Sequence, residues 1–166
     1  MSNIVKDIDM ATTVRLATPD EKGVVQNVDQ FYLYEFARFM PGYYKLGEDG
    51  LFHDEDYAPY WEDEHKYPYL ILHDDEIAGF ALIEDKGDER VLAQFFVLYK
   101  FQGMGVARVA ALDLFAQYPG RWVVHSLIKN PKSEGFWPKV IGEYSSDKFK
   151  VAVQEPRRTH HIYQFE

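Results

Sequence analysis

Hydrophobic and polar residues alternate along positions 11–17, a period of two that is typical of a β-strand with one buried face. The sequence Thr-Pro-Asp-Glu at 18–21 follows, with an N-cap residue, a proline suited to the first helical position and the acid of a capping box. We therefore expect a helix to begin here and to end before the Pro-Gly pair at 41–42. Its apolar side chains recur at spacings of three and four: Val25, Val28, Tyr32, Phe36 and Phe39.

The middle of the chain predicts an antiparallel meander. Two apolar runs, 67–73 and 77–83, are separated by the turn Asp-Asp-Glu at 74–76, as in a hairpin. A Gly-Asp pair at 87–88 then turns the chain into a third apolar run, 90–98. Short connections of this kind join antiparallel neighbours in a sheet.

A helix and a parallel strand are expected next. The apolar stripe of 107–118 has its small residues first, which lets this helix approach a sheet closely, and the Pro-Gly pair at 119–120 ends it. The apolar run 121–128 is the following strand. Because a helix connects it to strand 90–98, a right-handed crossover makes the two strands parallel.

The end of the chain predicts one more helix and two closing strands. The helix begins at Asn130, and the closing strands are expected at 143–154 and 157–165, around the Glu-Pro pair at 155–156. The full order is strand, helix, three-stranded meander, helix, strand, helix and two strands. This order predicts an α/β fold with a mixed sheet.

Length and composition predict one domain that spans 1–166. The chain has 166 residues, of which 46% are hydrophobic and 16% aromatic, ample for a core. No apolar run approaches the roughly 18 residues that a membrane span requires. Residues 1–7 lack the basic and apolar blocks of a signal peptide. We therefore expect a cytoplasmic protein, monomeric or homodimeric, with no membrane partner.

Cysteine content and charge exclude several classes of function. The chain has no cysteine, and hence no disulfide, thiolate metal ligand or cysteine nucleophile. Its six histidines lack metal-ligand spacing, so we predict no metal site. A net charge of −9 opposes binding to nucleic acid, because that affinity comes largely from Lys and Arg neutralising phosphates.

The most informative stretch is the turn Gln-Gly-Met-Gly-Val-Ala at 102–107. A glycine-rich turn that opens a helix directs several backbone N–H groups at one point, where the helix dipole also favours an anion. A P-loop would need Lys and then Ser or Thr directly after Gly105, where Val106 and Ala107 stand. A dinucleotide fingerprint would need glycine in place of Arg108. Both of these interpretations fail.

The pattern Gln102-x-x-Gly105-x-Ala107 after an apolar strand resembles the pyrophosphate-binding motif of the GNAT N-acetyltransferase superfamily. An ordinary strand, turn and helix would also use glycines for a tight connection. A second element favours the family, because the stretch from Asn130 to Trp137 resembles its Asn-x-x-Ala-x-x-Phe-Tyr helix, with serine for alanine and tryptophan for tyrosine. The resemblance is specific in the later part of the chain and covers the first part only in its order of elements.

The resemblance implies acetyl-CoA as co-substrate and the GNAT fold, a mixed, mostly antiparallel central sheet flanked by helices. In that fold two parallel strands splay apart and admit the acyl arm, and here they would be 90–98 and 121–128. Asn130 would position the arm, although an asparagine before Pro131 also suits a helix N-cap. The implied cofactor-binding residues are Phe96, Val97, Leu98, Gln102, Gly103, Met104, Gly105, Val106, Ala107, Arg108, Asn130 and Trp137.

Acetyl transfer to an amine needs a neutral amine, a polarised thioester carbonyl and a proton for the leaving thiolate. Backbone amides near Val97 are expected to polarise the carbonyl. The family often places a glutamate base on the strand before the turn. The matching residue here is Gln94, and glutamine cannot act as a base.

Other residues are therefore candidates for the proton transfers. Glu84, with Asp85 beside it, is the candidate base through a water, or simply a solvated carboxylate at the end of a strand. The indole of Trp137 does not ionise near neutrality. Tyr144 is the nearest phenol downstream and hence the candidate acid, or a structural tyrosine of a strand.

Two functions remain open at this point. One is an N-acetyltransferase that acts on a small amine or a protein amine, and the other is a catalytically idle acyl-CoA-binding or interaction module, motivated by Gln94 and Trp137. Residues 48–64 hold eight carboxylates and four aromatic rings. They form either a solvated loop or, by charge and cation–π contact, a site for a cationic small-molecule amine beside the acceptor side of the cleft.

Overall fold

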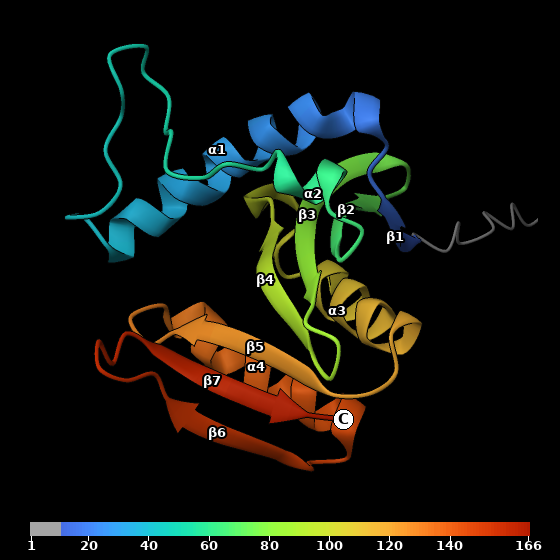
Figure 1. Cartoon of the computed structure of the whole chain (residues 1–166). Helices are drawn as coiled ribbons and strands as arrows, with labels where there is room; N and C mark the ends of the chain where they lie inside the picture. The colour runs from blue at the N-terminus through green and yellow to red at the C-terminus, as the bar shows by residue number, and fades with distance from the viewer. Residues whose placement is uncertain (1–10) are drawn as a thin grey trace, which may run out of the picture.

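The computed structural model describes residues 11–166, so residues 1–7, where the sequence predicts no signal peptide, lie outside the described range. The described chain forms a seven-stranded sheet in the order β1-β2-β3-β4-β5-β7-β6, with helices on both faces (Figure 1). The strands are β1 (Thr12–Leu16), β2 (Lys66–His73), β3 (Glu76–Asp85), β4 (Arg90–Val97), β5 (Trp122–Leu127), β6 (Phe149–Val153) and β7 (His160–Phe165). The helices are α1 (Lys22–Phe39), α2 (Pro59–Glu62), α3 (Val106–Gln117) and α4 (Pro131–Ser145). Within residues 11–166, none of the helices has both the length and the apolar character needed to cross a membrane.

The first half of the sheet is the predicted antiparallel meander. β1 pairs with β2, β2 with β3, and β3 with β4, all in antiparallel register. The β2–β3 turn holds Asp74 and Asp75 at φ of 49° and 64°, a conformation that aspartate adopts more readily than most residues. The predicted hairpin is therefore confirmed.

β4 and β5 form the predicted parallel pair and then splay apart. They pair only at their starts, residues 90–92 with 122–124. Just beyond this point the register with β3 shifts, which leaves Ala93 as a bulge between Leu92 and Gln94. Because a bulge bends its strand, β4 leaves β5, and Figure 1 shows the two strands diverging.

α1 follows the sequence prediction at both ends. A turn of 3-10 helix, Pro19–Glu21, precedes it, and the Glu21 carboxylate accepts a hydrogen bond from the Thr18 N–H at 2.8 Å. This is a contact of the predicted capping box. The helix ends at Phe39, with Met40 as its C-cap. Figure 1 shows that the end of α1 lies near the place where β4 and β5 separate.

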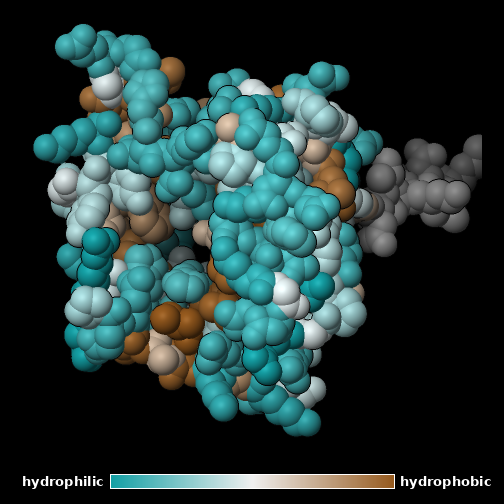
Figure 2. Space-filling view, in the orientation of Figure 1, coloured by the Kyte–Doolittle hydropathy of each residue, from teal (hydrophilic) through white to brown (hydrophobic). Residues whose placement is uncertain are grey.

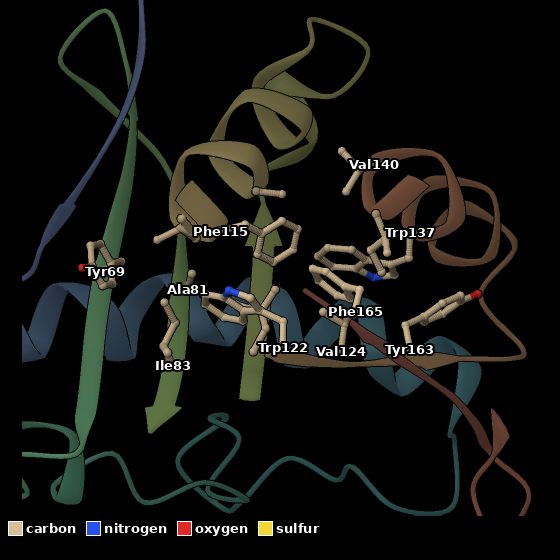
Figure 3. Close-up of a cluster of buried hydrophobic side chains, with 14 residues drawn as sticks. Tyr69, Ala81, Ile83, Phe115, Trp122, Val124, Trp137, Val140, Tyr163 and Phe165 are labelled. Carbon is tan, nitrogen blue, oxygen red and sulfur yellow. The ribbon is translucent and has the colours of Figure 1, made fainter. Parts of the chain in front are cut away.

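Two layers of helices hold the sheet together. On one face, Phe115 of α3 makes edge-to-face contacts with Trp122 of β5 and Phe165 of β7, within a cluster that α4 completes (Figure 3). On the other face, Tyr32 of α1 packs against Phe96 of β4, 5.5 Å between ring centroids. The first cluster includes side chains from both β4 and β5, so it holds these strands together although they have separated.

The end of the chain differs from the sequence prediction. α4 runs to Ser145 and β6 covers only Phe149–Val153, so the strand expected at 143–154 is wrong before residue 149. The apolar side chains keep helical spacing up to this point, and Ser146 ends the helix at φ 54°, in the left-handed conformation. Tyr144 is therefore a helix residue and not, as expected, a strand tyrosine.

Candidate active site

A cleft opens where β4 and β5 separate. Its volume is about 450 Å³, and its walls come from α1, β4, the β4–α3 turn, β5, α4 and β7. Figure 2 shows the molecule hollowed between the part that carries α1 and the part that carries β5 and β7, with apolar side chains in the wall. The cleft thus joins the predicted anion-binding turn to the first helix.

The β4 edge that faces the cleft has lost its strand partner. Leu98 donates its N–H to the Ala78 carbonyl at 2.8 Å, so the backbone groups of Leu98 and of every second residue before it point toward β3. In an antiparallel pair the alternate residues, here Phe95 and Val97, direct their backbone groups away from β3, toward the side that β5 has left. The Gln102 side chain donates to the Val97 carbonyl at 3.1 Å. An extended ligand with amide groups fits this edge as an added strand would.

The β4–α3 turn forms a cradle of backbone N–H groups. Gly103 and Gly105 have φ of 78° and 80°, a left-handed conformation that favours glycine. A Cβ built at either position meets open space. α3 begins at Val106, and the first N–H groups of a helix lack partners within it. The turn therefore fits an anion such as a pyrophosphate.

Two basic side chains stand beside this turn. Lys132, from the first turn of α4, donates to the Gln102 side chain at 2.8 Å and lies over the Tyr99 ring. Arg108 of α3 forms an ion pair with Glu143 of α4. Lys132 has no carboxylate partner among the described residues, so its charge is available to an anion in the cradle.

Asn130 and Trp137 line the cleft from α4. The Asn130 side chain accepts hydrogen bonds from the N–H groups of Lys132 and Ser133 at 3.2 and 3.4 Å. Its expected N-cap role is therefore confirmed. The Trp137 ring is buried and packs edge-to-face on Phe95 of β4, 5.3 Å between centroids. This contact ties α4 to the strand that forms the cleft wall.

Most residues predicted to bind the co-substrate line this one cleft: Phe96, Val97, Gln102, Gly103, Gly105, Val106, Ala107, Arg108, Asn130 and Trp137. Two do not. Leu98 follows β4 with its N–H bonded to β3, and Met104 is 50% exposed in the turn. That these residues contact acetyl-CoA stays a prediction.

The two predicted catalytic side chains stand outside the cleft lining. Glu84 accepts a hydrogen bond from Tyr60 at 3.0 Å and pairs with two lysines, Lys66 among them. Burial raises the pKa of Glu84, but these hydrogen bonds together outweigh it and lower the pKa, which weakens the carboxylate as a base. The Tyr144 hydroxyl donates to the Phe115 carbonyl at 3.1 Å, between α3 and α4. The geometry therefore does not favour either as base or acid.

The other end of the cleft is walled by α1. Glu35 supplies the one carboxylate among the described residues that line the cleft, and residues 48–64 supply no lining residue. Two aromatic rings of that acidic segment, Tyr57 and Tyr60, are instead buried in the core beneath α1. The aromatic rings that line this end of the cleft with Glu35 come from α1 itself: Tyr32, Phe36 and Phe39.

The acidic segment supports the cleft from behind. The Tyr57 hydroxyl donates to the Gln94 side-chain oxygen at 3.0 Å, so this cleft-lining amide is held in place. Asp29 of α1 lies close to Tyr57 and is buried, with 2% of its surface exposed. Burial, opposed by the nearby Tyr57 hydroxyl, raises the pKa of Asp29 to about 7.

Sequence reasoning missed four polar residues of the cleft: Glu35, His125, Lys132 and His160. Glu35 lies within the apolar stripe of α1, which the sequence indicated as a core face alone. The two histidines lie on β5 and β7. A signal for them was present, because once β4 and β5 splay, every second side chain on one face of β5 borders the gap.

Comparison with known proteins gives both a family and a fold. A model of the acetyltransferase (GNAT) family matches residues 31–142. A solved acetyltransferase from Thermus thermophilus has a TM-score of 0.67 at 18% identity, covering 93% of this chain and 96% of its own. PaiA N-acetyltransferase from Thermoplasma acidophilum, in complex with coenzyme A, has a TM-score of 0.64 at 10% identity, over 95% and 99%. RimL, a ribosomal L7/L12 α-N-protein acetyltransferase in complex with coenzyme A, has 0.59 at 13%, over 93% and 92%. No curated protein matches the sequence.

The low identities make the structural likeness evidence for the fold, and the GNAT fold implied by the resemblance is confirmed. The family model covers most of the chain, including β4, the glycine turn and the start of α4. These are the elements that form the N–H cradle and the free strand edge. The chain therefore belongs to the GNAT family of acetyltransferases.

Proposed function

We propose that this N-acetyltransferase moves the acetyl group of acetyl-CoA directly onto a positively charged small-molecule amine. The observation that carries the proposal is the composition of one continuous cleft. It has an N–H cradle at the β4–α3 turn, an unpaired strand edge along β4, and Glu35 at α1. The cradle matches the charge of a pyrophosphate, the strand edge matches the amides of a pantetheine arm, and Glu35 matches the charge of an ammonium group.

Residues at the cofactor end bind and orient. The turn after β4 and Lys132 hold the phosphates, and the β4 edge aligns the thioester arm. The Val97 N–H faces the cleft, where it stabilises negative charge that develops on the carbonyl oxygen. Acetyl-CoA supplies the activated acyl group.

The acceptor end favours a cation. Glu35 is partly buried and lines the same cleft as three aromatic rings of α1, and ring faces attract cations. The charges of Glu55 and Asp54 add to burial in raising the pKa of Asp29, which supports a negative electrostatic potential behind this end of the cleft. A polyamine, an amino sugar or a lysine-like group meets these conditions.

Turnover with a panel of cationic, neutral and anionic amines, followed as release of free thiol, tests the proposal. Cationic amines should be preferred. Salt should raise the acceptor KM more than the acetyl-CoA KM, because exposed charges are screened over roughly 10 Å at 0.1 M. Glu35→Gln should raise the acceptor KM about tenfold, since one charge pair at 4 Å contributes about 1 to 4 kcal/mol.

Glu48→Gln is the matched control, because Glu48 is an exposed carboxylate of the acidic segment outside the cleft lining. It should leave the acceptor KM unchanged. If Glu48→Gln acts as strongly as Glu35→Gln, the acceptor lies over the acidic segment instead. A preferred acceptor that is neutral or anionic would remove the cationic assignment, and acetyl-CoA binding without thiol release from any amine would favour the idle acyl-CoA-binding module.

A further inference from the structure

Two histidines occupy the cleft wall opposite Gln94. His125 directly follows Val124, the last β5 residue that pairs with β4. Val124 packs into the core under α3 and α4, so His125 points to the other face of the sheet, toward the cleft. His160 of β7 lies opposite Leu127 of β5 and shares that face. The two rings lie 6.5 Å apart between centroids.

The hydrogen bonds of His160 fix which ring nitrogen carries its proton. The Nδ1 atom lies 2.8 Å from the Thr159 hydroxyl oxygen and 3.2 Å from the Gln154 side-chain oxygen. The Thr159 hydroxyl itself donates to that Gln154 oxygen at 3.0 Å. Both partners of Nδ1 are thus acceptors, so Nδ1 is the donor. In the neutral ring, Nε2 is then left with a free lone pair.

The pKa of each imidazole is lowered, which favours the neutral form of both rings. His125 is exposed at the surface of the cleft, and the desolvation that the cleft walls still cause lowers its pKa. Burial, and then the charge of His125, lowers the pKa of His160. The neighbouring His161 faces the opposite side of the sheet, where it pairs with Glu134. The charged side chains that line the same cleft are Glu35 from α1, Arg108 from α3 and Lys132 from α4.

Resting on the proposed function, we propose that His125 is the general base for the acceptor amine and that His160 relays the proton to solvent. Gln94, on the opposite wall, has no basic atom and already accepts a hydrogen bond from Tyr57. His125 is the first β5 side chain to face the cleft after the strands part, so it borders the place where amine and thioester meet.

The proton balance of this step is complete. The acceptor enters as an ammonium and gives one proton to the free nitrogen of His125. The neutral amine then forms the C–N bond, while the C–S bond breaks with its electron pair on sulfur. The second amine proton goes to the thiolate, and His125 returns the first proton to solvent through His160. Amide, free thiol and one released proton are the products.

His125→Gln and His161→Gln form a matched pair of tests. His125→Gln should lower kcat by about 100-fold, within the range for loss of a general base, while the acetyl-CoA-dependent rise in Tm is kept. His161 lies on the same sheet but faces away from the cleft, so His161→Gln should keep kcat near wild type. The acid limb of kcat/KM in the wild type should disappear in His125→Gln alone.

An NMR titration of the imidazole resonances gives a readout without turnover. In the wild type, the His125 pKa should match the acid limb, and in His125→Gln the His160 pKa should rise because a neighbouring positive charge is gone. Full kcat and an unchanged acid limb in His125→Gln would overturn this inference and leave the proposed function standing. Absence of thiol release by the wild type with every amine would overturn both.

Discussion

Gly105 gives the sharpest test of where the phosphates of acetyl-CoA bind. Its φ is 80° and a Cβ there meets open space, so a side chain brings backbone strain without a clash. The left-handed conformation costs a residue other than glycine about 1–2 kcal/mol. At about 2–4 °C per kcal/mol, Gly105→Glu and Gly105→Gln should both fold, with the Tm lowered by about 2–8 °C.

Only the glutamate places a negative charge at the anion site. Two like charges 4 Å apart repel each other by about 1 kcal/mol in water and about 4 kcal/mol near a protein surface. That repulsion weakens phosphate binding by roughly fivefold to a thousandfold. Acetyl-CoA at 100 times its Kd stabilises the wild type by about 2.7 kcal/mol, or about 5–11 °C in Tm. Roughly a third to nearly all of this shift should be lost in Gly105→Glu, and the shift should be kept in Gly105→Gln.

Thermal unfolding with and without acetyl-CoA, at one ligand concentration and one salt concentration, measures these shifts. The glutamine variant has the size and the backbone strain of the glutamate variant, so the difference between them reports the charge alone. A full shift in Gly105→Glu would refute the placement of the phosphates at this turn. An equal loss in both variants would mean that bulk at Gly105, and not charge, closes the site.

Three further predictions follow from single contacts. Gly79→Ala should destabilise the fold by about 3 kcal/mol in urea unfolding, because the Cβ of an alanine there would lie 1.9 Å from the Phe96 carbonyl oxygen. Gly23→Ala is the control, since a Cβ on α1 at that position meets open space and the change should be neutral or stabilising. Asn130→Asp caps α4 equally well and should keep the Tm, so any loss of acetyl-CoA affinity, measured by calorimetry, would reveal a contact with the co-substrate. Asp29 has a pKa raised from 3.8 to about 7, so the native state binds a proton that the unfolded state has lost, and the wild type should lose stability as pH rises from about 4 to 7. Asp29→Asn should therefore be more stable than the wild type at pH 8. If the urea midpoints of the two proteins differ by the same amount at pH 5, this reasoning is contradicted.

The helix ends that the sequence predicted most reliably are those followed by glycine or proline. The Pro-Gly pairs at 41–42 and 119–120 follow helices that end at Phe39 and Gln117. The boundary between α4 and β6 has no such pair, and Ser146 ends the helix by adopting a positive φ. Pro138 also lies inside α4, where proline is expected to end a helix. Local sequence rules therefore failed where the packing of α4 on the sheet decides the structure.

The two ends of the cleft differed in how far they could be predicted, for a physical reason. The cofactor end consists largely of one contiguous stretch, so the spacing of Gln102, Gly105 and Ala107 already describes its geometry. The acceptor end is assembled from α1, β5 and β7. Its polar residues meet only because the Ala93 bulge bends β4 away. Strand alternation next to the expected splay could have indicated His125, but the local pattern around Glu35 indicates a core face alone.

The acidic segment shows what composition alone leaves open, because residues 48–64 supply no side chain to the lining of the cleft. The count of carboxylates in 48–64 predicted a charged wall, but the effect of a charge depends on its distance from the ligand, which composition does not report. Folding buries Tyr57 behind Gln94 and leaves Glu35 as the carboxylate in the cleft. The same reasoning applies to the missing glutamate at position 94. A base need only reach the amine, and the base that we propose, His125, lies on the facing strand β5.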